Sequence, residues 1–406
     1  MAMTSRQRVR RALRGQPTDR VPVDLGSTPL TGIAAGTLAR LRKALGLRDE
    51  PVKVDEPYQI LGRVEDDLRQ ALGVDTIDLA SPTTIFGYRN DGGWKPWQLQ
   101  DGTNVLVSDQ FQTTIDKNGD TLVYPKGDRT AAPSGRLPKG GYYFDAIVRQ
   151  QPLDEDNLDP EEYAEQFGRI SDADLELYAN KSEQLYRDTD YAIISCLSPG
   201  ALGDIAFVPA TEMILPKGPR DPALWYEFLI THTEYVRRIF EIQTEIGLKN
   251  LELYRQAVGD RIEAIVISGT DFGTQRGLFV SPDMFRDLWK PFYKRINDWV
   301  HQHTDWKTFY HSCGAVRELI DEFIDAGVDI LNPIQCSAEG MDPQGLKDDF
   351  GDRVTFWGGG VDTQKVLPFG TPDEVREQVA ERVRIFAPGE RFVFNTIHNI
   401  QHGVPV

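Results

Sequence analysis

The chain has 406 residues, enough for one large barrel domain or for about two or three smaller ones. Charged residues make up 26% and hydrophobic residues 40% of the sequence, which is typical of globular proteins and excludes extensive disorder. The formal net charge of −17 disfavours nucleic acid and anionic membrane surfaces as partners. Three cysteines are too few for a disulfide framework and suit a reducing cytosol, so a functional cysteine is expected to act as a thiolate; they are Cys196, Cys313 and Cys336.

The first 20 residues hold six arginines, but the apolar segment of a signal peptide does not follow them. Residues 6–14 are instead predicted to form a short helix, capped by Thr4 or Ser5 and ended by Gly15. No apolar run approaches the roughly 18 residues that a membrane span needs. The sequence therefore predicts a cytoplasmic protein.

From Val21 onward, short runs rich in valine, isoleucine and aromatic residues alternate with longer segments of helical periodicity, such as residues 221–247 and 371–386. This alternation predicts parallel strands joined by crossover helices. Eight such units favour an α/β fold with a single (β/α)8 barrel over residues 1–406. No predicted strand is followed by a G-x-G-x-x-G motif, which weakens the alternative of a doubly wound dinucleotide-binding fold. The predicted strands are residues 21–26, 74–80, 192–197, 262–268, 307–312, 328–333, 354–360 and 391–396.

The segment 83–143 interrupts the alternation after the second predicted strand. It contains an Asp-Gly and an Asn-Gly pair flanked by threonine, valine and aromatic residues, which is typical of β-hairpins. We expect an antiparallel insertion that forms either a lid, a homodimer contact or a solvated decoration of the barrel. The chain ends at Val406, soon after the eighth predicted strand, so a closing helix is expected either beyond that residue or not at all.

Active sites of such barrels lie at the carboxyl ends of the strands, where several polar residues of this sequence fall. His311 and Cys313 are two residues apart after the fifth predicted strand, so both side chains can reach one ion. Zinc accepts both ligand types, and a site with three protein ligands keeps a position open for catalysis. His398 is the expected third ligand. Cys336 is its rival, although a packed core cysteine is the favoured interpretation of that residue. The alternative is a packed cysteine beside a histidine that bonds a carbonyl group.

Asp271 follows the fourth predicted strand and opens a glycine-rich loop. Its carboxylate is expected to anchor a cation, to act as a general base, or only to cap the loop. Three glycines, residues 358–360, leave room for a ligand or form a tight turn. His232, His301 and His303 are assigned to packing or solvent, because none of them follows a strand.

Several long strings of the sequence resemble the uroporphyrinogen decarboxylase superfamily, and within it the cobamide-dependent methyltransferase branch. They include MTSRQRVRRALRGQPTDRVPVDLG at residues 3–26, YHSCGAVRELIDEFIDAGVDILNPIQ at 310–335, and VTFWGGGVDTQKVLPFGTPDEV with FVFNTIHNIQHGVP at 354–405. The branch includes methylcobamide:coenzyme M methyltransferases and corrinoid methyltransferases of methyl-ether demethylation. The resemblance implies a (β/α)8 barrel and covers nearly the whole chain apart from the hairpin segment.

The resemblance also implies zinc held by a His-x-Cys pair and a later cysteine. His311 and Cys313 match the pair, whereas His398 stands where that later cysteine is expected. It implies methyl transfer between a small methylated substrate or thiol and a corrinoid. The corrinoid is expected on a separate partner protein, because no D-x-H-x-x-G signature is present. Together with the catalytic Asp271, residues expected to bind or orient substrate are Asp24, Gln275, Tyr310, Asn332, Gln335, Asp362 and Asn395.

Two other functions stay open at this stage. The first is a metal-free decarboxylase of the same superfamily, although the arginine-rich run of uroporphyrinogen decarboxylase is missing beside Asp24, which disfavours a porphyrinogen substrate. The second is a catalytically silent barrel that serves as a binding subunit through segment 83–143. Replacing Cys313 distinguishes the first alternative from a zinc enzyme, and deleting the segment tests the second.

Overall fold

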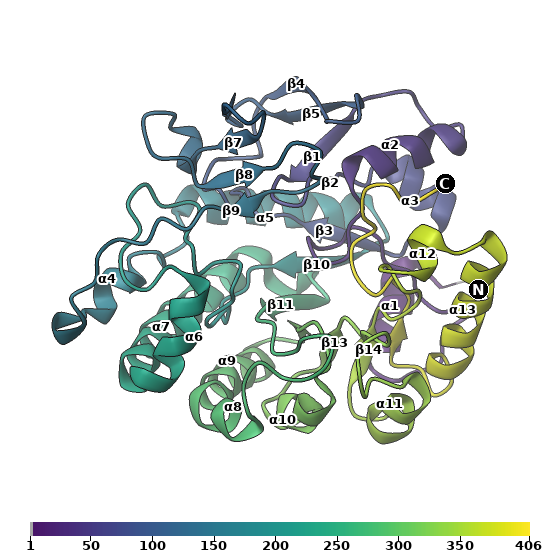
Figure 1. The fold of residues 1–406 in the computed structure, drawn as a ribbon. Coiled ribbons are helices and arrows are strands. Elements are labelled where there is room, and N and C mark those ends of the chain that lie inside the picture. Colours follow the sequence, from purple (N-terminus) through teal and green to yellow (C-terminus); the bar gives the residue numbers. More distant parts are fainter. Residues whose placement is uncertain (1–2) are drawn as a thin grey trace.

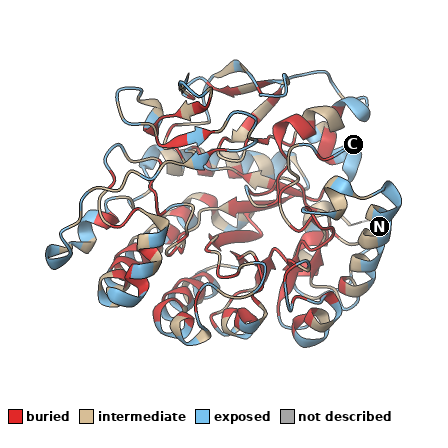
Figure 2. Cartoon of the chain, in the orientation of Figure 1, coloured by how far each residue is buried: buried red, intermediate tan, exposed pale blue. Residues whose placement is uncertain are grey.

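The structure is a computed structural model that describes residues 3–406. Seven parallel strands form one curled sheet in the order β15-β14-β13-β12-β11-β10-β3 (Figure 1). Strands that are consecutive along the chain are neighbours in this sheet, as β/α units require. The strands are short and almost entirely buried (Figure 2): β3 Thr76–Leu79, β10 Ala192–Cys196, β11 Ala264–Ser268, β12 Lys307–His311, β13 Ile330–Asn332, β14 Thr355–Trp357 and β15 Phe392–Val393.

Val23 connects the two edges of this sheet. It forms a parallel bridge with Phe394 beyond β15, and its carbonyl accepts a hydrogen bond from the N–H of Asp75 beside β3. The first predicted strand, residues 21–26, is therefore reduced to a single bridge. Pro22 has no N–H to donate, and the N–H of Val23 bonds the Asp75 carboxylate instead of a neighbouring strand. The α/β prediction is confirmed, and the curled sheet is consistent with a TIM-like barrel.

Helices cover the outside of the sheet and connect its strands. In Figure 2 they expose one side and bury the other, which is the pattern of amphipathic helices on a sheet. Several of them begin at good N-caps, such as Thr371, whose hydroxyl accepts from the Glu374 N–H. The helices are α3 Asp66–Leu72, α4 Pro160–Ala164, α5 Asp172–Asp188, α6 Pro222–Thr231, α7 Thr233–Val258, α8 Pro282–Leu288, α9 Lys290–His303, α10 Ile320–Asp325, α11 Pro343–Phe350, α12 Val366–Phe369 and α13 Pro372–Phe386.

One expected helix, residues 221–247, is two helices in the structure. α6 ends and α7 begins at His232, whose backbone is not helical (φ −130°, ψ 42°). The hydroxyls of Thr231 and Thr233 on either side bond to carbonyl groups one turn earlier, a contact that is known to bend helices. The prediction of one continuous helix was wrong at this point, and His232 has the packing role that was assigned to it, since its ring stacks on Phe228.

The first helix, α1 (Ser5–Leu13), packs on the sheet near β3, β10 and β15. Its N-cap is Thr4, and Thr4 and Gln7 form a capping box, as the threonine before the predicted helix suggests. Val9 and Leu13 join one apolar cluster with inward-facing residues of the strands, including Phe309 and Trp357. α1 therefore closes the amino-terminal side of the barrel interior, and the opposite, carboxyl side is left for the functional groups.

The segment between β3 and β10 contains antiparallel strands. β4 (Trp94–Gln98) and β5 (Asn104–Ser108) are joined through Asp101-Gly102, and β6 (Thr113–Ile115) and β7 (Thr121–Val123) through Asn118-Gly119. Both glycines have positive φ angles, which explains why glycine is needed there. Two further strands continue the second sheet, β8 (Gly135–Leu137) and β9 (Asp145–Ala146).

A short pair of strands that the sequence analysis missed extends the first antiparallel sheet. β1 (Val52–Glu56) runs parallel to β5 and antiparallel to β2 (Leu61–Gly62), and α2 (Ala35–Ala44) packs against both. These elements and the hairpins lie on one side of the barrel, away from α8 to α11 (Figure 1).

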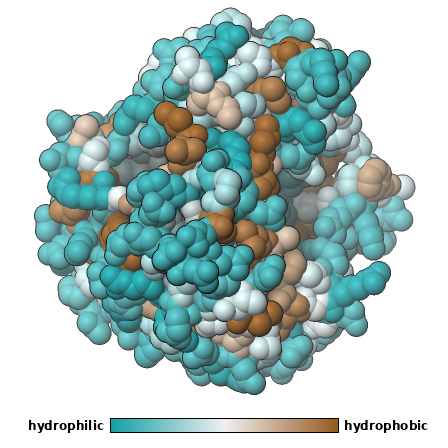
Figure 3. All heavy atoms as spheres, turned by 60° about the vertical axis from the view of Figure 1, so that its left-hand side comes forward, coloured by the Kyte–Doolittle hydropathy of each residue, from teal (hydrophilic) through white to brown (hydrophobic). Residues whose placement is uncertain are grey.

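The outer surface is mostly hydrophilic and carries only separate apolar patches on the face shown in Figure 3. Among residues 3–406, no helix combines the length and the apolar character that crossing a membrane requires.

Candidate metal centre

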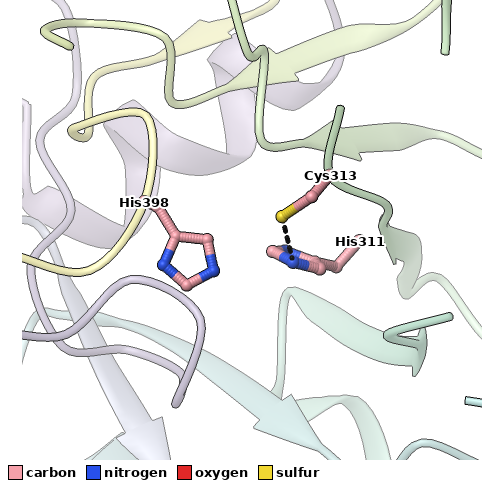
Figure 4. A group of neighbouring side chains, drawn as sticks. All are labelled: His311, Cys313 and His398. Atoms are coloured by element: carbon pink, nitrogen blue, oxygen red, sulfur yellow. Dashed lines mark hydrogen bonds between the residues drawn. The ribbon is translucent and has the colours of Figure 1, made fainter. Parts of the chain in front are cut away.

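Three potential metal ligands meet at the carboxyl ends of the strands. His311 is the last residue of β12, Cys313 follows it in the next loop, and His398 lies in the segment after β15. One ligand atom from each residue lies within 4.8 Å of the other two. The Cys313 Sγ is 3.3 Å from the His311 Nε2, and Figure 4 shows the His398 ring facing this pair from another part of the chain. Three donor atoms therefore surround one point.

The His311 ring is held in the tautomer that a metal requires. Its Nδ1 is 2.6 Å from the Asn332 Oδ1, and the Asn332 Nδ2 donates to the carbonyl of Trp357 at 2.9 Å. Because the amide NH2 is used by that carbonyl, the amide oxygen faces the ring and accepts from Nδ1–H. The lone pair of Nε2 is then free and points toward Cys313. Hydrogen bonds of this kind orient the histidines of many metal sites.

Burial sets the protonation of the three groups. It lowers the pKa of His311 to about 4 and, together with the neighbouring His311, that of His398 to about 4. Both imidazoles are therefore neutral near pH 7, which is the form that binds metals. Burial and the Asp271 carboxylate raise the pKa of Cys313 well above its ordinary value. This thiol keeps its proton unless a cation lies beside it.

One thiolate and two neutral imidazoles form a donor set that fits zinc. The three side chains are buried or half-buried, and their ligand atoms already lie close together without rearrangement. Three protein ligands leave a fourth position for a substrate atom, as in catalytic zinc sites. Within the described part of the chain, no other group of three histidine, cysteine or acidic side chains brings its potential ligand atoms this close together.

Asp271 lies beside the three ligands. Its Oδ1 accepts a 2.6 Å hydrogen bond from the N–H of Cys313 and is 3.9 Å from the His311 Nε2. About a third of its side chain, 35%, is exposed, so a substrate in the barrel mouth can reach the carboxylate. Burial raises its pKa above the ordinary value. The residue therefore positions the Cys313 loop and also offers an acid or base group.

The loop of Cys313 packs tightly on the loop of Asp271. The Ser312 hydroxyl accepts from the Phe272 N–H at 2.9 Å, and the Ala315 N–H donates to the Thr274 carbonyl at 2.8 Å. A side chain at Gly314, which has a φ of +92°, would lie 2.3 Å from the backbone of Gly273. Only glycine permits this approach, which keeps the thiol next to His311.

Asp204, which the sequence pattern does not single out, lies in the loop between β10 and α6. It is 7% exposed, and its Oδ1 accepts a 3.0 Å hydrogen bond from the Ala206 N–H. A side chain at Gly269 would come within 3.1 Å of the other oxygen, so that glycine makes room for the carboxyl group. Burial, opposed by that hydrogen bond and assisted by the charge of Asp271, raises the pKa of Asp204 to about 7. The only signal in the sequence is a Gly-Asp pair eight residues after a strand.

Most residues that were expected to bind substrate are hydrogen-bonded to the protein. Asn332 orients His311, as described above, and the Gln335 Oε1 accepts from the Gly314 N–H at 2.7 Å, which supports the Cys313 loop. The Asp362 Oδ1 accepts from the N–H groups of Gln364 and Lys365. These hydrogen bonds hold the three side chains in place, and their predicted contact with substrate stays a prediction.

Asp24 and Asn395 belong to a buried hydrogen-bond network. The Asp24 carboxylate accepts from the Thr76 hydroxyl at 2.6 Å and from the Trp357 indole N–H at 2.8 Å. The Asn395 Nδ2 donates to the Asp24 carbonyl at 2.9 Å. The Asn395 Oδ1 is buried without a hydrogen-bond partner, so of these two residues only Asn395 has a free polar atom.

The expected role of Tyr310 needs correction. Tyr310 does not cover the mouth, because residues alternate along β12: Phe309 and His311 face the barrel interior, and Tyr310 faces the helices, where its ring packs on Tyr293 and Phe323. Cys336, the rival third ligand, packs against the apolar cluster outside the sheet, as expected for a packed core cysteine.

The remaining predicted residues lie at the edge of the site or outside it. Gln275 is exposed, and only its backbone carbonyl makes a contact, with the Glu339 N–H. Gly358, Gly359 and Gly360 form a tight turn against the segments of Ile334 and Asn395 and leave no space for a ligand. His301 pairs with Asp329 and His303 bonds a helical carbonyl, in agreement with their predicted roles.

Comparisons with known proteins agree with this geometry. Residues 206–406 match the family described as Uroporphyrinogen decarboxylase (URO-D). Among solved structures, a methyltransferase from Methanosarcina mazei is similar over 99% of this chain and 95% of its own, with a TM-score of 0.53 and 18% identity. D-psicose 3-epimerase in the presence of D-fructose matches over 58% of this chain and 71% of its own, with 12% identity and a TM-score of 0.29, too low to support an argument. No curated protein has a significantly similar sequence.

The solved methyltransferase supports the fold along the whole chain, whereas the family match covers the part from the loop after β10 to the C-terminus. That part contains the three potential ligands and the residues that surround Asp204, whereas Asp204 itself lies just before it. The portion of the barrel that carries His311, Cys313 and His398 is therefore similar to the uroporphyrinogen decarboxylase family.

Proposed function

We propose that this chain is a zinc-dependent methyltransferase. It moves a methyl group between a small methylated substrate or thiol and a corrinoid carried by a partner protein. The observation that carries the proposal is the cluster of His311 Nε2, Cys313 Sγ and a His398 ring nitrogen within 4.8 Å of one another at the mouth of the barrel. The superfamily and the similar fold of a solved methyltransferase support it.

Zinc bound by these residues would act as a Lewis acid on the substrate atom that gives or receives the methyl group. The residues of the chain fix where that atom lies. Asn332 keeps Nε2 of His311 available, and Asp271 holds the Cys313 loop through its backbone N–H. Methyl transfer is an in-line displacement, so this positioning supplies much of the catalysis.

The two carboxyl groups beside the ligands supply proton transfer. With a thiol acceptor, the methyl group leaves the corrinoid as the S–CH3 bond forms, and the Asp271 carboxylate accepts the S–H proton. With a methyl ether donor, the C–O bond breaks as the methyl group moves to the corrinoid, and the ether oxygen takes a proton. Asp204, whose pKa of about 7 keeps it partly protonated at neutral pH, donates that proton. The direction of transfer therefore selects the residue that exchanges the proton.

The test compares Cys313→Ser with Cys336→Ser in the purified protein. Cys336 is the matched control, because it is also a half-buried cysteine but lies outside the ligand cluster. We expect about one zinc per chain in the wild type and in Cys336→Ser, and almost none in Cys313→Ser. Methyl transfer to a corrinoid protein, followed by the absorption spectrum of the cobalt, should be lost only in Cys313→Ser.

Other outcomes point to the alternative functions. Full activity of Cys313→Ser without metal, with release of CO2 from a carboxylated substrate, would identify a metal-free decarboxylase. Loss of a stable complex on deleting residues 83–143, with no turnover in any assay, would identify a binding subunit. Either result would refute the methyltransferase proposal.

A further inference from the structure

The third ligand, His398, lies on a part of the chain that the barrel strands do not hold. β15 ends at Val393, and residues 397–404, here called the C-terminal strap, run from the barrel toward α2 (Figure 1). Only the start of the strap is tied to the barrel, where the Ile397 N–H donates to the Val361 carbonyl at 3.0 Å. The position of His398 therefore depends on what the strap contacts.

Asn399, the residue after His398, makes the densest set of contacts in the strap. Its Oδ1 accepts from the Gly32 N–H at 2.5 Å, and its Nδ2 donates to the Pro29 carbonyl at 2.8 Å and to the Gln59 Oε1 at 2.9 Å. Asn399 is 1% exposed. One side chain thus connects the strap to the loop after Val23 and to the turn between β1 and β2.

The rest of the strap continues along α2 and the hairpin region. Ile400 pairs with Ile33 in a parallel bridge, and the Gln401 carbonyl accepts from the Thr37 hydroxyl at 2.9 Å. The His402 ring stacks on Tyr142, with 4.2 Å between ring centroids and an angle of 16°. These contacts belong to elements outside the seven-stranded sheet.

His311 and Cys313 are held in a different way. β12 is paired on both sides, with β11 and β13, and the Cys313 loop is fixed by Asp271 and Gln335. Two ligands are therefore preorganised by the barrel, whereas the third is delivered by the strap.

Resting on the zinc site of the proposed function, we propose that Asn399 is a positioning residue for His398. It completes the metal site by docking the strap on residues 29–32 and on Gln59. When the strap is undocked, only two ligands remain in place. The apparent metal affinity then falls in proportion to the fraction of molecules whose strap is docked. Replacing Asn399 by alanine also leaves buried partners unsatisfied, which favours the undocked state.

The experiment measures zinc affinity by competition with a chromophoric chelator, together with the visible spectrum of the Co²⁺-substituted protein, which reports the number of ligands. We expect Asn399→Ala to weaken Zn²⁺ binding by about 10- to 100-fold and to change the Co²⁺ bands. The matched control is Asn250→Ala, because Asn250 also bonds backbone groups with both ends of its amide, at Ile170 and Gly168. That control should leave affinity and spectrum unchanged.

The result that overturns the inference is a folded Asn399→Ala protein with wild-type zinc affinity and an unchanged Co²⁺ spectrum. If Asn399→Ala does not fold, Gln59→Ala decides, since it removes one of the three contacts. It should weaken binding by a few fold, and wild-type binding in this variant overturns the inference. A wild-type protein that binds no zinc is a separate result, because it refutes the metal site itself and with it the proposed function.

Discussion

The two ends of the barrel differ in whether their buried ionisable groups have partners of opposite charge. At the amino-terminal end, the fully buried Asp75 carboxylate is paired with Arg8 at 2.5 Å and with Arg20 at 2.6 Å, and Arg8 also bonds Asp19 at 2.6 Å. Arg10 pairs with Glu263 on the same side. Each of these charges has an opposite charge beside it, so this end contributes to holding the barrel closed.

At the carboxyl end, buried ionisable groups gather without such partners. Within residues 3–406, neither Asp204 nor Asp271 forms an ion pair with a lysine or an arginine. Asp271 instead lies 3.9 Å from the His311 Nε2, and burial, helped by the charges of both carboxyl groups, raises the pKa of Cys313. Unpaired buried groups are costly for stability and are concentrated at functional sites. The difference indicates that one end of the barrel stabilises the fold and the other performs the chemistry.

The largest effect on stability is expected from Asp75→Asn at the amino-terminal end. It leaves the buried Arg8 guanidinium with one partner fewer, and breaking such a buried pair costs about 3–5 kcal/mol of unfolding free energy. Zinc affinity should not change. Urea denaturation and chelator competition measure the two quantities. A variant of unchanged stability would show that this end is not the stabilising one.

The converse change is His311→Ala at the carboxyl end. We expect zinc affinity to fall by more than about 100-fold, beyond the effect of losing an outer hydrogen bond, because a ligand is removed. Near pH 7, the unfolding free energy of the zinc-free variant should equal that of the zinc-free wild type to within about 1 kcal/mol. Any larger loss is expected to come only from the cavity that the ring leaves. A variant that keeps zinc but unfolds readily would reverse the comparison.

A smaller effect is expected at Asn332, which touches the ligand and not the metal. Asn332→Ala should weaken zinc binding by about 10-fold or somewhat more, because the Nδ1–H of His311 loses its acceptor and the ring loses its orientation. Isothermal titration at fixed pH measures the change. Affinity equal to that of the wild type would show that the tautomer is set by another group.

The smallest effect concerns pH and the zinc-free protein. The pKa of His398 is about 4 in the folded chain and about 6.5 when unfolded, so the unfolded state binds the proton first as the pH falls. Stability is therefore lost between about pH 6.5 and pH 4, by about 1 kcal/mol for this histidine at pH 5.5. When the pH is lowered from 7.5 to 5.5, the unfolding free energy of His398→Gln should therefore fall by about 1 kcal/mol less than that of the wild type. A stability difference that does not vary with pH would contradict the burial of a neutral imidazole.

The fold was largely readable from the sequence because parallel strands buried on both faces leave continuous apolar runs. Seven of the eight predicted strands are present, and α1 and α13 begin at the threonines that precede them. β1 was missed, since its sequence VKVDE carries three charged residues in five, and only its alternate valines are fully buried. The first strand was overestimated because Pro22 and Asp75 replace its ladder contacts.

The site was predictable where a ligand follows a strand directly, as for His311, Cys313 and Asp271. Asp204 was not, because its loop brings it back to the mouth through contacts that have no local sequence pattern. Tyr310 was misassigned because the one-residue alternation along β12 decides which face it occupies. The choice between His398 and Cys336 required the three-dimensional path of the strap and of the loop after β13.

The most direct test of the central claim is anomalous diffraction at the zinc absorption edge from crystals of the protein prepared with zinc. We predict one strong peak per chain between His311, Cys313 and His398, at about 2.0–2.1 Å from the two ring nitrogens and about 2.3 Å from the sulfur. A map without a peak between these three side chains, in a protein with full activity, would contradict it.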